Sequence, residues 1–208
     1  MLLPFSYPFI IRFNLKRTKT LLDAGSGNGR FMTEINWDKK YRVVGVDLFD
    51  AYIRQANATK LYYKILKQDI RKLNFKKNSF DAVLASQIVE HFTKTDALKV
   101  IKKMEECAKY TIIISTPNGH FRQEAYDGND LQEHLSSWSP PDFRKLGYSV
   151  YGQGLKLIYG EEGLIHTFLG KFFPTRILIF TFSYLMSPFV YYFPQYGTYL
   201  IGVKRKKT

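Results

Sequence analysis

The sequence contains very little cysteine, and this shortage limits its chemistry. Cys107 is the one cysteine among 208 residues, which excludes an internal disulfide and a multi-cysteine metal site. A reducing compartment is therefore permitted, and we expect a cytoplasmic protein. The residues around Cys107 follow a helical pattern, so we interpret it as a buried apolar residue rather than a nucleophile. We assign no metal ligands from the sequence.

Acidic residues are also few, at 18 against 31 lysines and arginines, which gives a net charge of +13. Such a chain suits anionic surfaces, whether nucleic acid or acidic lipid. The alternative is a lysine-rich solvated exterior, because the basic residues are scattered apart from the cluster at 204–207. The length fits a single α/β domain over residues 1–208.

The first 17 residues lack the features of a secretory signal peptide. They have no basic leading region and no small-residue cleavage site, and Pro4 and Pro8 interrupt them. We expect an apolar N-terminal arm whose aromatic side chains cover the core of the domain. Coverage of the mouth of a ligand site is the alternative.

Glycine is concentrated at residues 21–31, LLDAGSGNGRF. An apolar strand, expected at 20–24, meets an acid and three alternate glycines that open a helix at about 29–37. Glycine permits positive φ angles and lets a ligand approach the bare backbone. Arg30 stands where a dinucleotide motif needs its third glycine, and no Lys-Ser or Lys-Thr pair follows as a phosphate-binding loop requires. The pattern predicts a cofactor site while disfavouring NAD, FAD and ATP.

Further apolar runs predict strands at 42–47, 61–69, 80–86 and 111–116, separated by helical patterns. The first two end in Asp47 and Asp69. Carboxyl ends of parallel strands meet at one edge of a sheet, so these acids should lie near the glycine turn, where Asp47 can accept both hydroxyls of a ribose. For Asp47 the alternative is an N-cap of the helix that follows, a role that Asp50 could also fill. For Asp69 the alternative is an acid in a surface turn.

Two of these segments carry a family resemblance. The spacing acid-x-G-x-G-x-G resembles the first motif of class I S-adenosylmethionine-dependent methyltransferases. FDAVLAS followed by QIVEHFTK resembles the fourth-strand motif of the small-molecule branch of that superfamily. The resemblance covers roughly the first 120 residues. It implies an α/β fold with a seven-stranded, mostly parallel, doubly wound sheet in the order 3-2-1-4-5-7-6. Strand 7 would be antiparallel, with the last two strands at 149–151 and 196–204.

The resemblance also implies a set of residues that bind S-adenosyl-L-methionine. Substrate residues cannot be transferred in the same way, because the segments that would carry them depart from the family pattern. The implied contacts are Asp23, Gly25, Ser26, Gly27 and Gly29 with the methionine moiety, Asp47 and Leu48 with the ribose, Asp69 and Ile70 with the adenine, and Ser86 and Gln87 with the sulfonium side.

His91 and His134 are the candidate catalytic bases, needed only if the acceptor must lose a proton. His91 follows the fourth strand, and a structural histidine beneath the cofactor is the alternative there. His134 lies in the polar segment 120–139, where class I enzymes usually place a loop over the substrate.

The main departure from the family is an apolar insertion at 155–195, between the sixth and seventh strands. No charged residue occurs from Ile177 to Val203. Three interpretations stay open, namely docking of 164–207 on an anionic membrane, an apolar lid or dimer contact, and a membrane span. Lys171, Arg176 and the terminal basic cluster favour docking.

These features predict methyl transfer to a small or lipid-like acceptor, on an oxygen, nitrogen or carbon atom. DNA amino-methylation is disfavoured because SQIV replaces the N/D-P-P-Y/F motif after the fourth strand, and cytosine-C5 methylation because no nucleophilic cysteine is available. RNA or protein methylation through the basic surface is the alternative within the class. A non-catalytic, membrane-associated binding protein is the alternative from another class.

Overall fold

The computed structural model describes residues 2–125 and 128–206. Its centre is a seven-stranded sheet in the order β3-β2-β1-β4-β5-β7-β6, in which only the pairs made by β7 are antiparallel. The predicted topology is therefore confirmed. The strands are β1 (Thr20–Ala24), β2 (Arg42–Asp47), β3 (Lys64–Lys67), β4 (Phe80–Ser86), β5 (Ala108–Pro117), β6 (Ser149–Leu155) and β7 (Gly197–Arg205).

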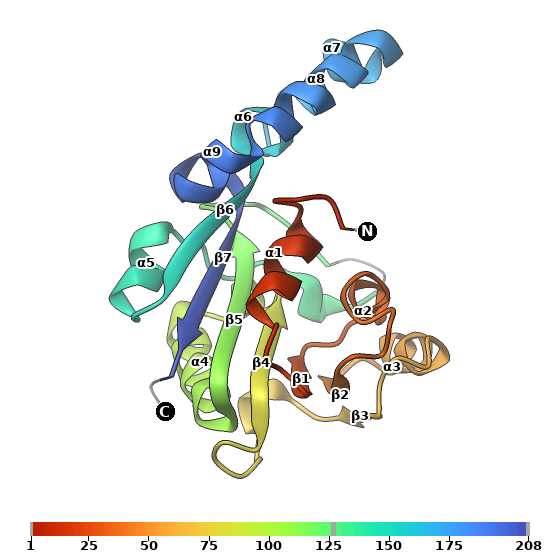
Figure 1. Cartoon of the computed structure of the whole chain (residues 1–208), viewed down its shortest axis with the longest axis vertical. Helices are drawn as coiled ribbons and strands as arrows, with labels where there is room; N and C mark the ends of the chain where they lie inside the picture. The colour runs from red at the N-terminus through yellow and green to blue at the C-terminus, as the bar shows by residue number, and fades with distance from the viewer. Residues whose placement is uncertain (1, 126–127, 207–208) are drawn as a thin grey trace.

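Helices cover both faces of this sheet (Figure 1). Successive residues of a strand point to opposite faces, so Leu21 packs into the cluster beneath α1 and α2, and Leu22 into the cluster beneath α4 and α5. Both leucines are fully buried. The helices of the sheet region are α1 (Tyr7–Asn14), α2 (Arg30–Ile35), α3 (Asp50–Ala58), α4 (Lys94–Cys107) and α5 (Pro140–Lys145), with short 3₁₀ turns η1 (Ile70–Lys72), η2 (Val89–His91) and η3 (Asp130–Gln132).

Strand lengths differ from the sequence prediction at three places. Strand β3 is limited to four residues, although Tyr63 and Gln68 on either side still donate backbone hydrogen bonds to β2. Strand β5 is longer at both ends because it is paired on both sides, with β4 and β7. Strand β6 continues to Leu155, which pairs with Gly197, so the first residue of the predicted insertion belongs to the sheet.

The N-terminal arm contains helix α1, which Ser6 caps by accepting a hydrogen bond from the Phe9 backbone N–H. Ile10 and Ile11 of this helix are buried against the sheet. The arm therefore covers the core. Its first helical residue, Tyr7, also reaches the carboxyl ends of β4 and β5.

The chain between β6 and β7 folds as helices α6 (Lys156–Tyr159), α7 (Phe168–Lys171), α8 (Phe173–Leu185) and α9 (Ser187–Tyr192), with turns η4 (Leu164–His166) and η5 (Pro194–Tyr196). Strand β6 runs parallel to β5, so this insertion leaves the sheet at the edge where the parallel strands end. Figure 1 shows α7 and α8 projecting beyond that edge. Within residues 2–125 and 128–206, no helix combines the length and apolar character needed to cross a bilayer.

Candidate functional site

The glycine turn between β1 and α2 needs glycine at both of its ends. Gly25 has a φ of +87°, and a Cβ there would lie 2.0 Å from Cδ1 of Ile88. Gly29 has a φ of +77°, and its Cβ would lie 2.8 Å from the Cα of Ala56. Gly27 also has positive φ, but a Cβ there would meet no atom within 4 Å. The centre of the turn therefore faces open space, as a ligand seat requires.

Asp47, at the end of β2, holds this turn in place. Its Oδ2 accepts the Gly27 backbone N–H at 2.7 Å, and its Oδ1 accepts those of Leu48 and Phe49 at 2.8 and 3.0 Å. Asp47 is not the N-cap of α3, a position that Phe49 fills, while Asp50 lies in the first helical turn. The carboxylate is thus fixed beside the glycines, as the strand-end argument predicts.

A cavity of about 250 Å³ opens at this edge of the sheet. Five of the predicted cofactor residues line it, and the segment around 129–135 closes its other side. The predicted lining residues are Gly25, Asp47, Leu48, Asp69 and Ile70, and further walls come from Gln68, Arg71, Ile88, His91, Phe92, Thr93 and Asp96.

Asp69 binds two groups of Arg71, which sequence analysis did not predict. Its carboxylate caps η1 by accepting the Arg71 backbone N–H at 2.8 Å, and it pairs with the guanidinium of Arg71, with 2.7 Å between Oδ2 and Nη2. This pair lowers the pKa of Asp69. A ligand amine at this position would share the carboxylate with Arg71, while the neighbouring Ile70 forms an apolar wall of the cavity.

Asp23 lies beneath the turn rather than in the cavity wall. Tyr62 donates a hydrogen bond from its hydroxyl to Oδ2 of Asp23 at 2.7 Å. Burial raises the pKa of Asp23 to about 7, and the charge of Asp47 acts in the same direction. Sequence analysis missed Tyr62, which precedes β3 and meets Asp23 only through the pairing of distant strands.

At the end of β4, Ser86 and Gln87 lie under the N-terminal arm. The Tyr7 hydroxyl is 2.7 Å from Oγ of Ser86 and also hydrogen-bonds to Ser115 at the end of β5. Gln87 has a φ of +56°, and its backbone N–H donates to the Ser115 carbonyl at 2.9 Å. Burial raises the pKa of the Tyr7 phenol. Tyr7 therefore lies at this edge of the sheet, although the arm otherwise covers the core.

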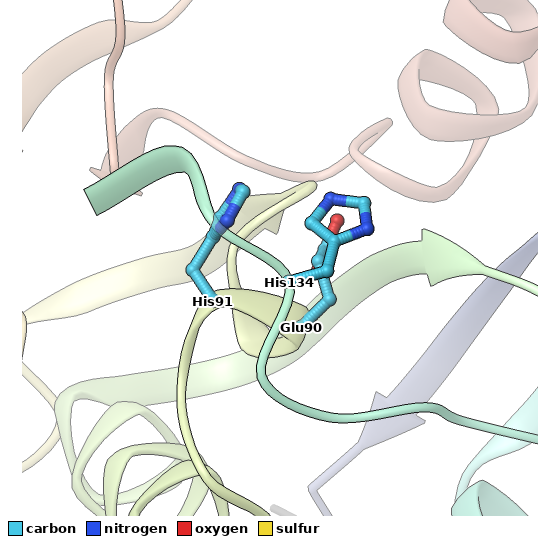
Figure 2. Close-up of side chains that lie close together, drawn as sticks. All are labelled: Glu90, His91 and His134. Carbon is cyan, nitrogen blue, oxygen red and sulfur yellow. The ribbon is translucent and has the colours of Figure 1, made fainter. Parts of the chain in front are cut away.

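The two candidate bases face each other across the same edge (Figure 2). His91 comes from η2 and His134 from the segment 120–139, with 5.0 Å between the ring centroids. Burial lowers the pKa of His91, and the neighbouring His134 acts in the same direction. Glu90, also missed as a site residue, lies beside them with 1% of its surface exposed, and burial raises its pKa to about 8.

The cavities at this edge adjoin one another through shared walls. A space of about 180 Å³ lies against Glu90 and His134 and shares His91 with the cavity of about 250 Å³. It shares Phe121 with a larger space of about 590 Å³, which the insertion borders through Leu157 and its neighbours. Three spaces thus follow one another from the glycine turn to the insertion.

The site fits an S-adenosylmethionine-like ligand on two further observations. The Ser26 hydroxyl is buried in the turn and finds no hydrogen-bond partner within the described part of the chain. Gly27 beside it leaves room for a group to approach the backbone. The carboxylates of Asp47 and Asp69 offer polar contacts along one wall of the cavity, and Ser26 and Gly27 lie in the turn beside that wall.

Comparison with known proteins agrees with the motifs. Residues 21–110 match the family described as methyltransferase domain. An uncharacterized protein of Methanocaldococcus jannaschii is 25% identical over 140 residues, which are 67% of this chain and 59% of that protein. The chain thus spans about three fifths of the length of this curated relative.

Solved structures share this fold, two of them over nearly the whole chain. A SAM-dependent methyltransferase from Archaeoglobus fulgidus superposes with a TM-score of 0.58 at 15% identity, covering 96% of this chain and 94% of that one. The methyltransferase domain of bacterial CtHen1 gives 0.60 at 16% identity, with 98% of both chains covered. Magnesium protoporphyrin IX methyltransferase of Synechocystis PCC 6803, solved with bound SAM, gives 0.50 at 19% identity over 70% of this chain and 68% of that one.

Proposed function

We propose that the chain is a class I S-adenosylmethionine-dependent methyltransferase that moves the methyl group of this cofactor to a small or lipid-like acceptor at a membrane surface. The observation that carries the proposal is the row of adjoining spaces between the glycine turn and the apolar insertion. One end fits the cofactor, and the other end opens among apolar side chains.

The cofactor, when bound, supplies a methyl group already activated on a sulfonium. The protein therefore has to hold, align and dehydrate the reactants rather than activate the donor. Asp47 fixes the glycine turn by accepting the Gly27 backbone N–H, and the open space at Gly27 lets the ligand approach the turn. The segment around 129–135 forms one side of the cavity, so with the cofactor in place it would help to exclude water.

The acceptor would enter from the insertion side. The larger space is bordered by Leu155, Leu157 and Tyr196, which suit an apolar body. Phe121 separates it from the smaller space, where Glu90 and the two histidines suit a polar head. An acceptor with a polar head and an apolar tail matches this order of surfaces.

The insertion also supports docking on an anionic membrane. Helix α8 exposes Leu178 and Leu185 to about 70%, with Phe173 at 72%. Single exposed apolar residues are ordinary, but a contiguous helix of them indicates a contact surface. Lys171 and Arg176 lie at its start, and anionic lipid attracts such residues by about 1 kcal/mol each.

Calorimetric titration with S-adenosylmethionine and S-adenosylhomocysteine tests the cofactor. We expect micromolar binding, about −8 kcal/mol. Asp47→Asn should weaken it at least tenfold, because the amide cannot match a carboxylate toward both the turn and ribose hydroxyls. Asp50→Asn is the matched control, since Asp50 pairs with Lys67 on the surface and should bind as wild type. A folded wild type that binds neither ligand would reject the enzyme proposal.

Co-sedimentation with vesicles tests the membrane part separately. We expect wild-type protein to bind phosphatidylcholine vesicles that contain phosphatidylserine. Phe173→Ser combined with Leu178→Ser should leave the protein in solution. Leu98→Ser, at an exposed position of α4, is the control and should not alter binding. Equal binding by the α8 variant would favour a lid or dimer contact instead.

A further inference from the structure

We propose that Glu90, His91 and His134 bind a divalent first-row transition-metal cation in the space that receives the acceptor. The metal site itself is independent of methyl transfer, but its role toward the acceptor rests on the proposed function. Sequence analysis assigned no metal ligands, because His134 is 43 positions beyond His91 and only the fold brings the two together.

The three side chains already converge. One ligand atom from each residue, a ring nitrogen or a carboxylate oxygen, lies within 4.8 Å of the other two. Figure 2 shows the two imidazoles side by side above η2, with the carboxylate of Glu90 behind His134. Two ligands about 2.1 Å from one ion lie at most about 4.2 Å apart, so small side-chain rotations suffice to close the set.

Hydrogen bonds prepare both histidines as ligands. Nδ1 of His91 lies 3.1 Å from the Glu133 carbonyl, and Nδ1 of His134 lies 2.7 Å from the Phe121 carbonyl. A carbonyl can only accept, so each Nδ1 carries the hydrogen and each Nε2 keeps its lone pair. Metal-binding histidines are usually fixed in this way by a backbone carbonyl or carboxylate behind the ring.

Glu90 supplies the third ligand through a buried carboxyl group. Both carboxylate oxygens are buried and make no hydrogen bond of good geometry among residues 2–125 and 128–206, although the Thr116 hydroxyl lies close enough to act on the carboxyl group. A buried carboxylate without a well-formed hydrogen bond is costly, and a bound cation removes that cost. The Glu90 carbonyl also accepts the backbone N–H groups of Leu135 and Ser136, at 2.8 and 3.0 Å, which fixes the segment carrying His134 against η2.

The ligand set indicates the kind of ion. Two imidazole nitrogens and one carboxylate suit manganese, iron, cobalt or zinc, whereas calcium and magnesium prefer sites built from oxygen alone. Three protein ligands leave coordination positions open toward the cavity, whose other walls include Gln87, Gln132 and Tyr199. The open positions are available to an oxygen of the acceptor.

With such an ion in place, we take the acceptor to be a hydroxyl compound. Such an ion, held by Glu90, His91 and His134, would lower the pKa of a bound hydroxyl, so that its proton could pass to water before methyl transfer. The hydroxyl oxygen forms a bond to the methyl carbon. The bond from this carbon to sulfur breaks with its electron pair on sulfur, which leaves a methyl ether and neutral S-adenosylhomocysteine.

Titration of the untagged protein with Mn²⁺ and with Zn²⁺ tests the site. We expect one saturable site that is at least tenfold weaker in His134→Ala and in Glu90→Gln. His166→Ala, in turn η4 of the insertion, removes a histidine away from the cluster and should bind as wild type. Added Mn²⁺ should also broaden the ring proton signals of His91 and His134 in wild-type protein more than those of His166, which requires no variant to fold.

Parallel titration with S-adenosylhomocysteine separates this proposal from the function. Cofactor binding without saturable metal binding overturns the metal site and leaves methyl transfer standing. Metal binding without cofactor binding supports the site and rejects the enzyme. Unchanged metal affinity in folded His134→Ala, or broadening of His166 instead of His91, overturns the assignment of ligands.

Discussion

Helices α4 and α8 have nearly the same length, 14 and 13 residues, but opposite relations to solvent. Helix α4 carries seven charged residues and still buries a full apolar face against the sheet. Helix α8 carries one charged residue, Arg176, and in the described structure buries Ser183 alone. The more apolar helix is thus the more exposed one.

This contrast shows which apolar surface the fold itself buries. The apolar face of α4 is matched by strands β4 and β5, so its burial stabilises the fold. The apolar surface of α8 faces outward and contributes little to folding. This surface leaves water only when another molecule or a membrane binds it. We therefore assign a binding role to α8.

Truncating one apolar side chain in each helix should give the largest difference in the free energy of unfolding. Met104→Ala in α4 removes a fully buried side chain and should lower the free energy of unfolding by about 2–5 kcal/mol. Leu178→Ala in α8 should change it by less than about 0.5 kcal/mol. Urea denaturation followed by circular dichroism measures both. A loss above 2 kcal/mol for Leu178→Ala would mean that α8 packs against the chain.

The pH dependence of stability should expose the buried acid beneath the cofactor turn. Asp23 has a folded pKa of about 7 against an ordinary 3.8, so the folded state holds its proton more tightly than the unfolded state. Its contribution is complete at about pH 4 and is lost as the pH rises to 7, by up to about 1.4 kcal/mol per pH unit.

Asp23→Asn keeps an acceptor for the Tyr62 hydroxyl and removes this titration. Relative to wild type, the variant should therefore gain stability between pH 4 and pH 7. Denaturant midpoints at several pH values measure the difference. Parallel curves for the two proteins would contradict the raised pKa.

Gly27 should matter to the ligand more than to the fold. Gly27→Ala introduces a methyl group where the turn is open, so cofactor affinity should fall about tenfold, or about 1.4 kcal/mol. Gly147→Ala, after α5, is the matched control because it has a φ of +83° and ordinary contacts only. Both should lose about 1 kcal/mol of stability. Equal cofactor affinity in the two variants would place the ligand away from Gly27.

The smallest effects concern charge near α8. Lys171→Gln and Arg176→Gln should each weaken binding to phosphatidylserine-containing vesicles by about 1 kcal/mol, and the loss should shrink at high salt. Lys102→Gln in α4 removes the same charge elsewhere and serves as the control. If all three variants lost equal affinity, the net charge rather than α8 would be responsible.

The sheet and the cofactor edge were predictable because they depend on local patterns. Apolar runs ending in Asp47 or Ser86 give both a strand and its carboxyl end, and the glycines mark the turn between them. Contacts between distant segments were not predictable. Tyr7 lies 79 positions from Ser86, and Tyr62 lies 39 positions from Asp23, so no local pattern announces either hydrogen bond.

The acceptor side was the least predictable part. Composition revealed an apolar insertion, but its helices are set by packing of α9 on β6 and by exposure of α8, which residue type alone does not distinguish. Glu90 was visible as part of a motif, yet its burial depends on the segment carrying His134. The sequence therefore located the edge of the site better than its chemistry.

The position of the insertion within the sheet has a consequence for how this protein could diversify. Its two ends meet at Leu155 and Gly197, which are paired residues of neighbouring antiparallel strands. A tight turn could join the strands at that point, so the whole segment is a modular unit with adjacent attachment points. Exchanging it would alter what the protein docks on while the glycine turn, Asp47 and the strand order stay as they are.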